Sequence, residues 1–173
     1  MKGKIILNLA MSIDGYIADV NGNYDWIKGD GNKNLDTYEK WDFDLFLKDI
    51  DIILMGKNCY DEGFHKEFEN KQVFVATSKK LKNYDNINFI NENIESILID
   101  EKNKGKNIYL FGGGVTVAPF IEKNLIDEYI IGIIPIILGD GKKLFVLQNN
   151  LVQLKLTKYL VNEGVVILNY VRR

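Results

Sequence analysis

A run of three glycines, Gly112, Gly113 and Gly114, constrains the fold more than any other feature. The apolar residues 108–111 before it predict a buried strand. The apolar residues after it recur at helical spacing: Val115, Ala118, Ile121 and Leu125. Glycines at such a junction leave backbone N–H groups unhindered at the positive end of a helix dipole, which favours phosphate binding. The alternative is a simple tight turn, because the spacing matches neither GxGxxG nor a P-loop.

Composition limits the remaining possibilities. With 173 residues the chain is long enough for one domain, residues 1–173, and too short for two comfortable ones. The net charge of −2, without a basic stripe, argues against nucleic acid as the main partner. The single cysteine, Cys59, and the single histidine, His65, exclude an internal disulfide and argue against a metal site or a Ser-His-Asp triad.

The sequence also shows no signal peptide and no membrane span. Its longest apolar stretch, residues 129–138, is too short to cross a bilayer and is interrupted by Pro135. We therefore expect a cytoplasmic protein that does not bind membranes.

Strands and helices alternate along most of the chain. Hydrophobic patterning predicts strands at residues 4–9, 52–55, 72–76, 87–90, 108–111 and 129–137. It predicts helices at residues 35–48 and 94–102, and a third after the glycine run with Thr116 as its cap and Pro119 in its first turn. A turn leads into extended chain at 12–18, residues 19–36 form a long ordered loop, and a hairpin joins 152–161 to 165–171. This order predicts an α/β fold with a mostly parallel sheet and an antiparallel hairpin at its edge.

The predicted carboxyl ends of the strands carry residues that suit a phosphorylated ligand. In parallel sheets, ligands bind outside these ends. The ends here hold residues 8–10, Gly56 with Lys57, Thr77 with Ser78 and Lys79, and the glycine run. Hydroxyls, lysines and glycines gathered at one edge favour a nucleotide.

Five motifs in this order resemble a known family: SIDGYIA, ILMGKNCY, FVATSKK, FGGGVTVAPFI and LIDEYIIGIIPIILGDGKKLF. The chain resembles the dihydrofolate reductase-like superfamily over nearly its whole length. It is most similar to the stand-alone branch related to the reductase domain of riboflavin biosynthesis enzymes. The resemblance implies a three-layer α/β/α fold that binds NADPH along its strand ends and delivers a hydride to a small heterocycle.

The resemblance also implies roles for individual residues. Ala10, Ile17 and Ala18 would line the nicotinamide, and Trp26 would lie where the long loop meets the substrate. The pyrophosphate would bind the segment from Gly112 to Val115, where the family often has a cis Gly–Gly bond, and the flanking Phe111 and Thr116 would also belong to the cofactor site. The ribose and 2′-phosphate of the adenosine would bind five residues: Gly56, Lys57, Thr77, Ser78 and Lys79. The two lysines favour NADPH over NADH.

The substrate side departs from the family pattern. Riboflavin-type reductases have a basic residue after S-x-D-G and a glutamate before the glycine run, where this chain has Tyr16 and Phe111. Dihydrofolate reductases orient the pterin with one carboxylate, whereas this region offers several and none aligns cleanly: Asp36, Glu39, Asp42 and Asp44. Asp14 is a candidate proton donor, although an Asp before a Gly also stabilises turns.

We therefore consider three interpretations. The first is an NADPH-dependent reductase of a small substrate, and the second is a nucleotide-binding protein of the same fold with little or no catalysis. A riboflavin-type pyrimidine reductase is a variant of the first, and a polar substrate pocket beside the nicotinamide would separate the first from the second. The third is an oligomer, with a homodimer expected, that uses residues 129–138 and the C-terminal hairpin as its interface.

Overall fold

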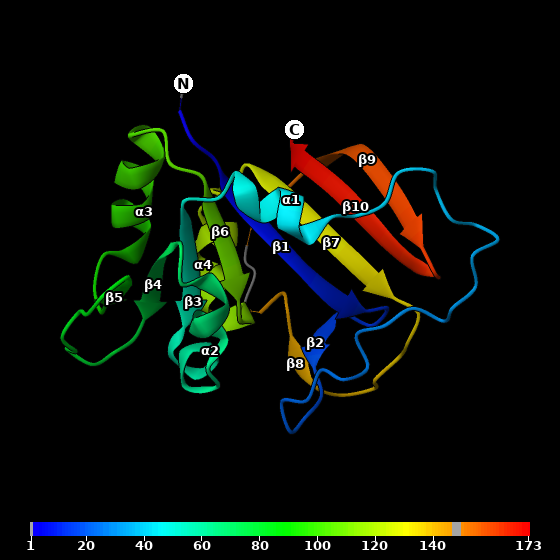
Figure 1. The fold of residues 1–173 in the computed structure, drawn as a ribbon, viewed down its shortest axis with the longest axis horizontal. Helices are drawn as coiled ribbons and strands as arrows, with labels where there is room; N and C mark the ends of the chain where they lie inside the picture. Colours follow the sequence, from blue (N-terminus) through cyan, green and yellow to red (C-terminus); the bar gives the residue numbers. More distant parts are fainter. Residues whose placement is uncertain (1, 147–149) are drawn as a thin grey trace.

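The computed structural model describes residues 2–146 and 150–173. Within these residues eight strands form one sheet, in the order β5-β4-β3-β6-β1-β7-β10-β9 (Figure 1). Their bounds are β1 Ile5–Ser12, β3 Ile52–Gly56, β4 Gln72–Ala76, β5 Ile87–Ile90, β6 Ile108–Gly112, β7 Glu128–Ile134, β9 Leu154–Asn162 and β10 Val165–Arg172. The strands from β5 to β7 pair in parallel, while β10 is antiparallel to both β7 and β9. This arrangement confirms the predicted mostly parallel sheet with a C-terminal antiparallel hairpin.

Helices cover both faces of the sheet and give it three layers. One face packs against α3 (Ile94–Asn103) and α4 (Gly114–Glu122). The other face packs against α1 (Phe43–Lys48), α2 (Lys57–Asp61) and the 3₁₀ helix η1 (Phe64–Phe68). A separate two-stranded sheet joins β2 (Tyr16–Ala18) to β8 (Lys142–Lys143).

The apolar strand β1 lies inside the sheet because its side chains are buried on both faces. Ile5 and Leu7 belong to the core beneath α3 and α4, and Ile6 belongs to the opposite core. Parallel strands covered on both faces have this nearly continuous apolar sequence. Asn8 is the polar exception within the run, and it is 7% exposed.

The helix predicted over residues 35–48 is much shorter in the structure. It begins at Phe43, where the Asp42 carboxylate accepts the N–H of Leu45 at 2.8 Å and caps the first turn. The preceding residues are held on the C-terminal hairpin instead. Thr37 accepts the N–H of Val161 with its hydroxyl and donates its own N–H to the Val161 carbonyl. These hydrogen bonds outweigh the apolar periodicity.

Two boundaries near prolines also differ from prediction. Strand β7 ends at Ile134 and not at residue 137, because Pro135 has no N–H to continue the ladder. Helix α4 begins at Gly114 with Gly113 as its cap, so Thr116 is not the cap and Pro119 lies inside the helix.

Strand β7 lies between β1 and β10, so both of its edges are paired within the sheet, whereas β9 of the C-terminal hairpin is an edge strand. The expected homodimer, with an interface at residues 129–138 and the hairpin, stays a prediction. In the described parts of the chain, none of the helices has the length and apolar character needed to cross a membrane.

Candidate functional site

The long loop between β2 and α1, residues 19–42, forms one wall of the site. Its first turn is built on Asp19, whose carboxylate accepts the N–H groups of Asn21 and Asn23, each at 2.8 Å. Further along, the Asp30 N–H donates to the Glu163 carbonyl in the turn between β9 and β10. The loop is therefore fixed to the C-terminal hairpin and passes over the sheet between these anchors.

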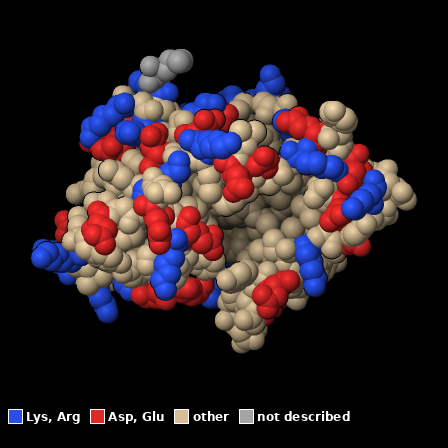
Figure 2. Space-filling model, viewed as in Figure 1, with Lys and Arg blue, Asp and Glu red and all other residues tan. Residues whose placement is uncertain are grey.

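A pocket of about 280 Å³ lies between this loop and the sheet. Figure 2 shows it as a hollow with an uncharged interior and charged side chains along its rim. Its floor comes from β1, β7 and β10, and its walls come from β6, the long loop and the start of α1. The lining residues are Asn8, Leu9, Ala10, Ile27, Lys28, Trp41, Phe43, Tyr109, Gly132, Ile134, Val165 and Ile167.

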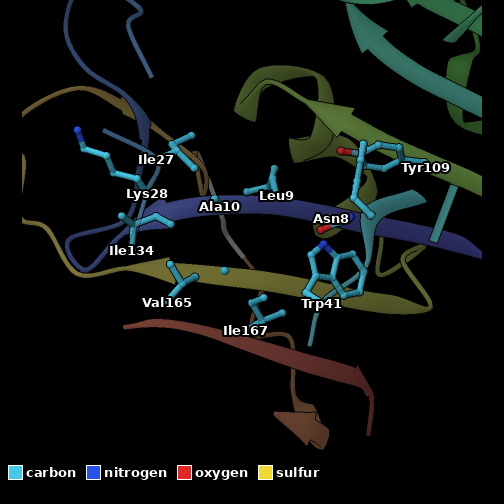
Figure 3. A pocket seen from close by; sticks show the side chains of 12 residues that line it. Asn8, Leu9, Ala10, Ile27, Lys28, Trp41, Tyr109, Ile134, Val165 and Ile167 are labelled. Carbon is cyan, nitrogen blue, oxygen red and sulfur yellow. The ribbon is translucent and has the colours of Figure 1, made fainter. Parts of the chain in front are cut away.

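The two ends of the pocket differ in chemistry. Figure 3 shows Asn8, Tyr109 and Trp41 gathered at one end, with Ile27 and Lys28 at the other. We refer to the first group as the inner end. Burial raises the pKa of the Tyr109 phenol above its ordinary value, so this group remains a neutral hydroxyl. Among the described lining residues, Lys28 is the only charged one.

No described carboxylate lines the pocket, and three of the four predicted nearby have structural partners. Asp36 forms an ion pair with Lys40 and accepts the Glu163 N–H at 2.7 Å. Glu39 pairs with a lysine on β9, Asp42 caps α1, and Asp44 lies in the first turn of α1. A pterin-type carboxylate contact is therefore not available from these residues.

The glycine run lies beside the pocket, at the carboxyl end of β6. The Gly112–Gly113 peptide bond is cis, as the resemblance implied. Gly113 caps α4, and no described residue accepts the N–H of Gly114 or Val115. A Cβ on Gly112 would lie 3.9 Å from the Leu9 side chain, so the run also contacts β1. These free N–H groups sit at the positive end of the helix dipole.

The predicted adenosine residues follow the same sheet edge. Gly56 pairs in register with Ala76, which places Lys57 next to Thr77. A Cβ on Gly56 would approach the Thr116 hydroxyl to 2.6 Å, so this segment also adjoins α4. Lys57 forms an ion pair with Asp61. The residues after β4, Ser78 and Lys79, are exposed, and the Lys79 N–H donates to the Thr77 hydroxyl at 3.1 Å.

Of the residues proposed for the nicotinamide, Ala10 adjoins the pocket and Ile17 adjoins the glycine run. Ala10 lines the pocket, and a Cβ on Gly113 would lie 3.9 Å from Ile17. Ala18 is buried and pairs with β8. The structure thus brings these predicted residues to one edge of the sheet.

Three other candidates have contacts of a different kind. Asp14 accepts hydrogen bonds from the Ser12 hydroxyl and from the N–H groups of Leu138 and Gly139, and these lower the pKa of its carboxyl. This favours the turn-stabilising alternative over proton donation. Trp26 does not line the pocket, and its indole N–H donates to the Asn23 carbonyl at 3.1 Å. The Phe111 ring packs among aromatic rings, 5.2 Å from that of Phe64.

Sequence analysis placed Asn8 among the strand-end residues that face a ligand, but it missed Tyr109 and Trp41. A signal was present for Asn8, because it is a lone polar residue in an otherwise apolar strand. None was present for Tyr109 or Trp41, because aromatic residues in a strand or beside a helix usually belong to the core. Burial raises the pKa of the Cys59 thiol, and a hydrogen bond from the Gly113 backbone opposes that shift.

Comparison with known proteins gives the family. Residues 3–168 match the RibD C-terminal domain, and the chain belongs to this family. The uncharacterized protein YyaP of Bacillus subtilis (strain 168) is 34% identical over 171 residues, which cover 88% of this chain and 86% of YyaP. The family and its riboflavin-pathway neighbours support a reductase-like function.

Solved structures agree on the fold. A "Putative riboflavin biosynthesis protein" from Shewanella sp. PV-4 has a TM-score of 0.83 and 29% identity, with 98% of this chain and 99% of that chain covered. Dihydrofolate reductase from Enterococcus faecalis, solved with NADP(H), has a TM-score of 0.68 at 16% identity, covering 100% and 98%. The fold is therefore dihydrofolate reductase-like, as predicted.

Proposed function

We propose that this chain is an NADPH-dependent reductase that acts on a small planar substrate in the pocket above β1 and β7. The observation that carries the proposal is the position of Leu9. Leu9 is one of the residues that line the pocket, and its side chain, which packs on the α3/α4 face of the sheet, lies beside Gly112 of the glycine run. A dinucleotide held by the glycine run would thus have its nicotinamide next to the pocket, near Ala10 and Ile17.

The residues present fit such a cofactor. Two N–H groups at the start of α4 are free to bind a pyrophosphate, and the nine-residue helix behind them adds its dipole. Lys57 and Lys79 lie at adjacent strand ends and suit a 2′-phosphate, which is why we propose NADPH and not NADH. Dihydrofolate reductase of E. faecalis, which shares the fold, was solved with NADP(H).

The chain would contribute orientation and an environment that excludes water. When bound, the cofactor supplies a hydride from its nicotinamide ring. The apolar floor and walls hold a flat substrate against that ring, while Asn8 and Tyr109 fix its orientation. Since no described lining residue is acidic, the reduced product would take its proton from water at the end of the pocket where Lys28 lies.

The alternative of a nucleotide-binding protein without catalysis is less well supported, because a pocket with polar groups adjoins the nicotinamide position. The alternative of a riboflavin-type pyrimidine reductase is also less well supported, because two substrate-side residues of this chain differ from those of that group. Tyr16 directs its hydroxyl to the Gly139 carbonyl at 3.4 Å, and Phe111 lies among aromatic rings. Neither side chain offers the charge found at these positions in that group.

Calorimetric titration with NADPH and NADH at fixed ionic strength tests the proposal. We expect NADPH to bind more tightly, and Lys57→Ala or Lys79→Ala to weaken it about tenfold, since each removes a charge-assisted hydrogen bond. Lys155→Ala is the matched control, because Lys155 is exposed on the edge strand β9, away from this site. Equal millimolar binding of both nucleotides would contradict the proposal.

A further inference from the structure

A hydrogen bond between Tyr60 and Tyr84 joins two segments that carry lysines. Tyr60 lies in α2, one turn after Lys57. Tyr84 lies in the loop between β4 and β5, which extends beyond the ends of these strands (Figure 1). The two hydroxyl oxygens are 2.8 Å apart. This bond therefore ties the loop to the helix directly.

The Tyr60 ring is held in place by its neighbours. It stacks on the His65 ring at a centroid distance of 4.3 Å, and it meets the Phe89 ring edge-on at 5.1 Å. The Nζ atom of Lys57 lies 5.2 Å from the centroid of the same ring and forms an ion pair with Asp61. Such ring contacts favour particular geometries, so they restrict the Tyr60 side chain. Its hydroxyl therefore meets the loop from a fixed position beside Lys57.

The loop is held against this helix at both of its ends. At its start, the register of β3 with β4 places Thr77 next to Lys57. Near its other end, the Tyr84 N–H donates to the Ile87 carbonyl at 3.1 Å, and the Ile87 N–H donates back to the Tyr84 carbonyl at 2.8 Å. This turn holds the backbone of Tyr84 while its hydroxyl bonds to Tyr60. The residues between Thr77 and Tyr84 therefore form a closed loop beside Lys57.

Three lysines lie on this loop: Lys79, Lys80 and Lys82. All three are exposed, and no carboxylate in the described chain forms an ion pair with them. Lys57 already has Asp61 as its partner, so it offers little free charge to a phosphate group that carries about two negative charges. The lysines of the loop supply further positive charge only while the loop lies close to Lys57. Discrimination of a 2′-phosphate should therefore depend on how the loop is held.

We propose that the Tyr60–Tyr84 hydrogen bond is a positioning contact, which holds the lysine-bearing loop beside Lys57 and strengthens the preference for a cofactor with a 2′-phosphate. Neither hydroxyl has to touch the phosphate. The bond restricts the loop before the cofactor arrives, so less conformational freedom is lost on binding. This inference rests on the proposed function, because it concerns the binding of NADPH at the same site.

Two nucleotides that differ only in the 2′-phosphate test the inference: adenosine 2′,5′-bisphosphate and adenosine 5′-monophosphate. Their dissociation constants are measured by calorimetry at fixed ionic strength. We expect the native chain to bind the bisphosphate more tightly. Tyr84→Phe should weaken binding of the bisphosphate about threefold, because one neutral hydrogen bond is lost. Its affinity for the monophosphate should not change.

A double-mutant cycle assigns the effect to the bond between the two hydroxyls. Tyr60→Phe should weaken binding of the bisphosphate by the same factor as Tyr84→Phe. The double variant should bind it no more weakly than either single variant, whereas independent effects would multiply to about ninefold. A ninefold loss in the double variant would overturn the inference. An unchanged preference in either single variant would overturn it as well.

Tyr159→Phe is the matched control. Tyr159 is 60% exposed on β9, at the opposite edge of the sheet from β5, and no described residue bonds to its hydroxyl. Its substitution should leave both dissociation constants unchanged. Urea unfolding of every variant measures stability separately. A purely structural role of the tyrosine pair would weaken both nucleotides together and leave the preference as it is in the native chain.

Titration of the same samples with NADPH and NADH separates this inference from the proposed function. If the native chain prefers NADPH and Tyr84→Phe keeps the full preference, the positioning role alone is overturned. If Tyr84→Phe loses part of the preference for the bisphosphate but NADPH does not bind, the positioning role is supported and the reductase proposal is overturned. A native chain without any preference for the bisphosphate would overturn the positioning role together with the assignment of the lysines to a 2′-phosphate.

Discussion

The backbone N–H of Asp30 donates to the carbonyl oxygen of Glu163 at 2.8 Å, and this bond ties the long loop to the C-terminal hairpin. The two segments lie far apart in sequence, and the hairpin turn is where they meet. The loop supplies Ile27 and Lys28 to the pocket, while β10 supplies Val165 and Ile167. The hairpin therefore contributes to the site twice, through its own side chains and by fixing the opposite wall.

Gly29 tests this anchor. A Cβ at this position would lie 2.0 Å from the Glu163 carbonyl oxygen, so Gly29→Ala should push the loop off the hairpin. We expect a loss of about 1–3 kcal/mol in the free energy of unfolding, as for other overpacked sites, together with weaker binding of pocket ligands. Urea unfolding measures the first effect, and calorimetric titration with NADPH, whose nicotinamide we place beside the pocket, measures the second.

Gly31→Ala is the control for Gly29→Ala. Gly31 has a φ of +82° and no atom within 4 Å of an added Cβ, so its substitution strains the backbone without a clash. It should reduce stability by about 1 kcal/mol with little effect on ligand binding. Because the Gly31 N–H also donates to the Glu163 carbonyl, at 3.3 Å, equal weakening in both variants would assign the effect to backbone strain at this anchor and not to the clash.

The glycine run allows a matched pair of substitutions. A Cβ on Gly114 would lie 2.3 Å from the Lys143 carbonyl oxygen, whereas a Cβ on Gly113 would meet only Ile17, at 3.9 Å. Gly114→Ala should therefore destabilise the fold by about 1–3 kcal/mol. Gly113→Ala should unfold at a urea concentration close to the unfolding midpoint of the native chain. It should nevertheless bind NADPH at least about tenfold more weakly, because its methyl group enters the phosphate site. Unchanged NADPH affinity in Gly113→Ala would argue against pyrophosphate binding there.

The sequence predicted the sheet better than it predicted the pocket. Runs such as residues 52–55 and 72–76 are apolar throughout because both faces are covered, and such runs predict buried strands. The segment before Phe43 has helical periodicity, but Thr37 bonds to Val161, more than a hundred residues away. Contacts between distant segments also bring together the pocket residues Tyr109 and Trp41. The local sequence does not reveal these contacts.

Tyr109→Phe should separate stability from binding. The residue is buried but lines the pocket, and its hydroxyl has no partner in the described chain, so its removal should leave the free energy of unfolding unchanged or raise it by up to about 1 kcal/mol. Tyr84→Phe is the control, because that hydroxyl bonds to the Tyr60 hydroxyl at 2.8 Å, and its loss should cost about 0.5 kcal/mol. A marked loss of stability in Tyr109→Phe, measured by urea unfolding, would show that the hydroxyl has a structural partner.

Asp14 should give the stability of the fold a component that depends on pH. The Ser12 hydroxyl, and then the N–H groups of Gly139 and Leu138, lower the pKa of this carboxyl below its ordinary value of 3.8. The folded state thus holds the ionised form more strongly than the unfolded state does. The stabilisation is fully present above the ordinary pKa and is lost as the pH falls through the lower pKa of the folded state. Asp14→Asn should therefore be less stable than the native chain at pH 7, and the difference should shrink as the solution becomes acidic.

Thermal unfolding from pH 7 downwards measures this convergence, and Asp25→Asn is the matched control. Asp25 is exposed and has no hydrogen bond to its carboxylate in the described chain, so its substitution should leave the curve parallel to that of the native protein. The opposite outcome is a difference in stability between Asp14→Asn and the native chain that stays constant down to acid pH. That result would mean that the size and hydrogen-bond geometry of the side chain, and not its charge, hold the turn after β1 against the segment after β7.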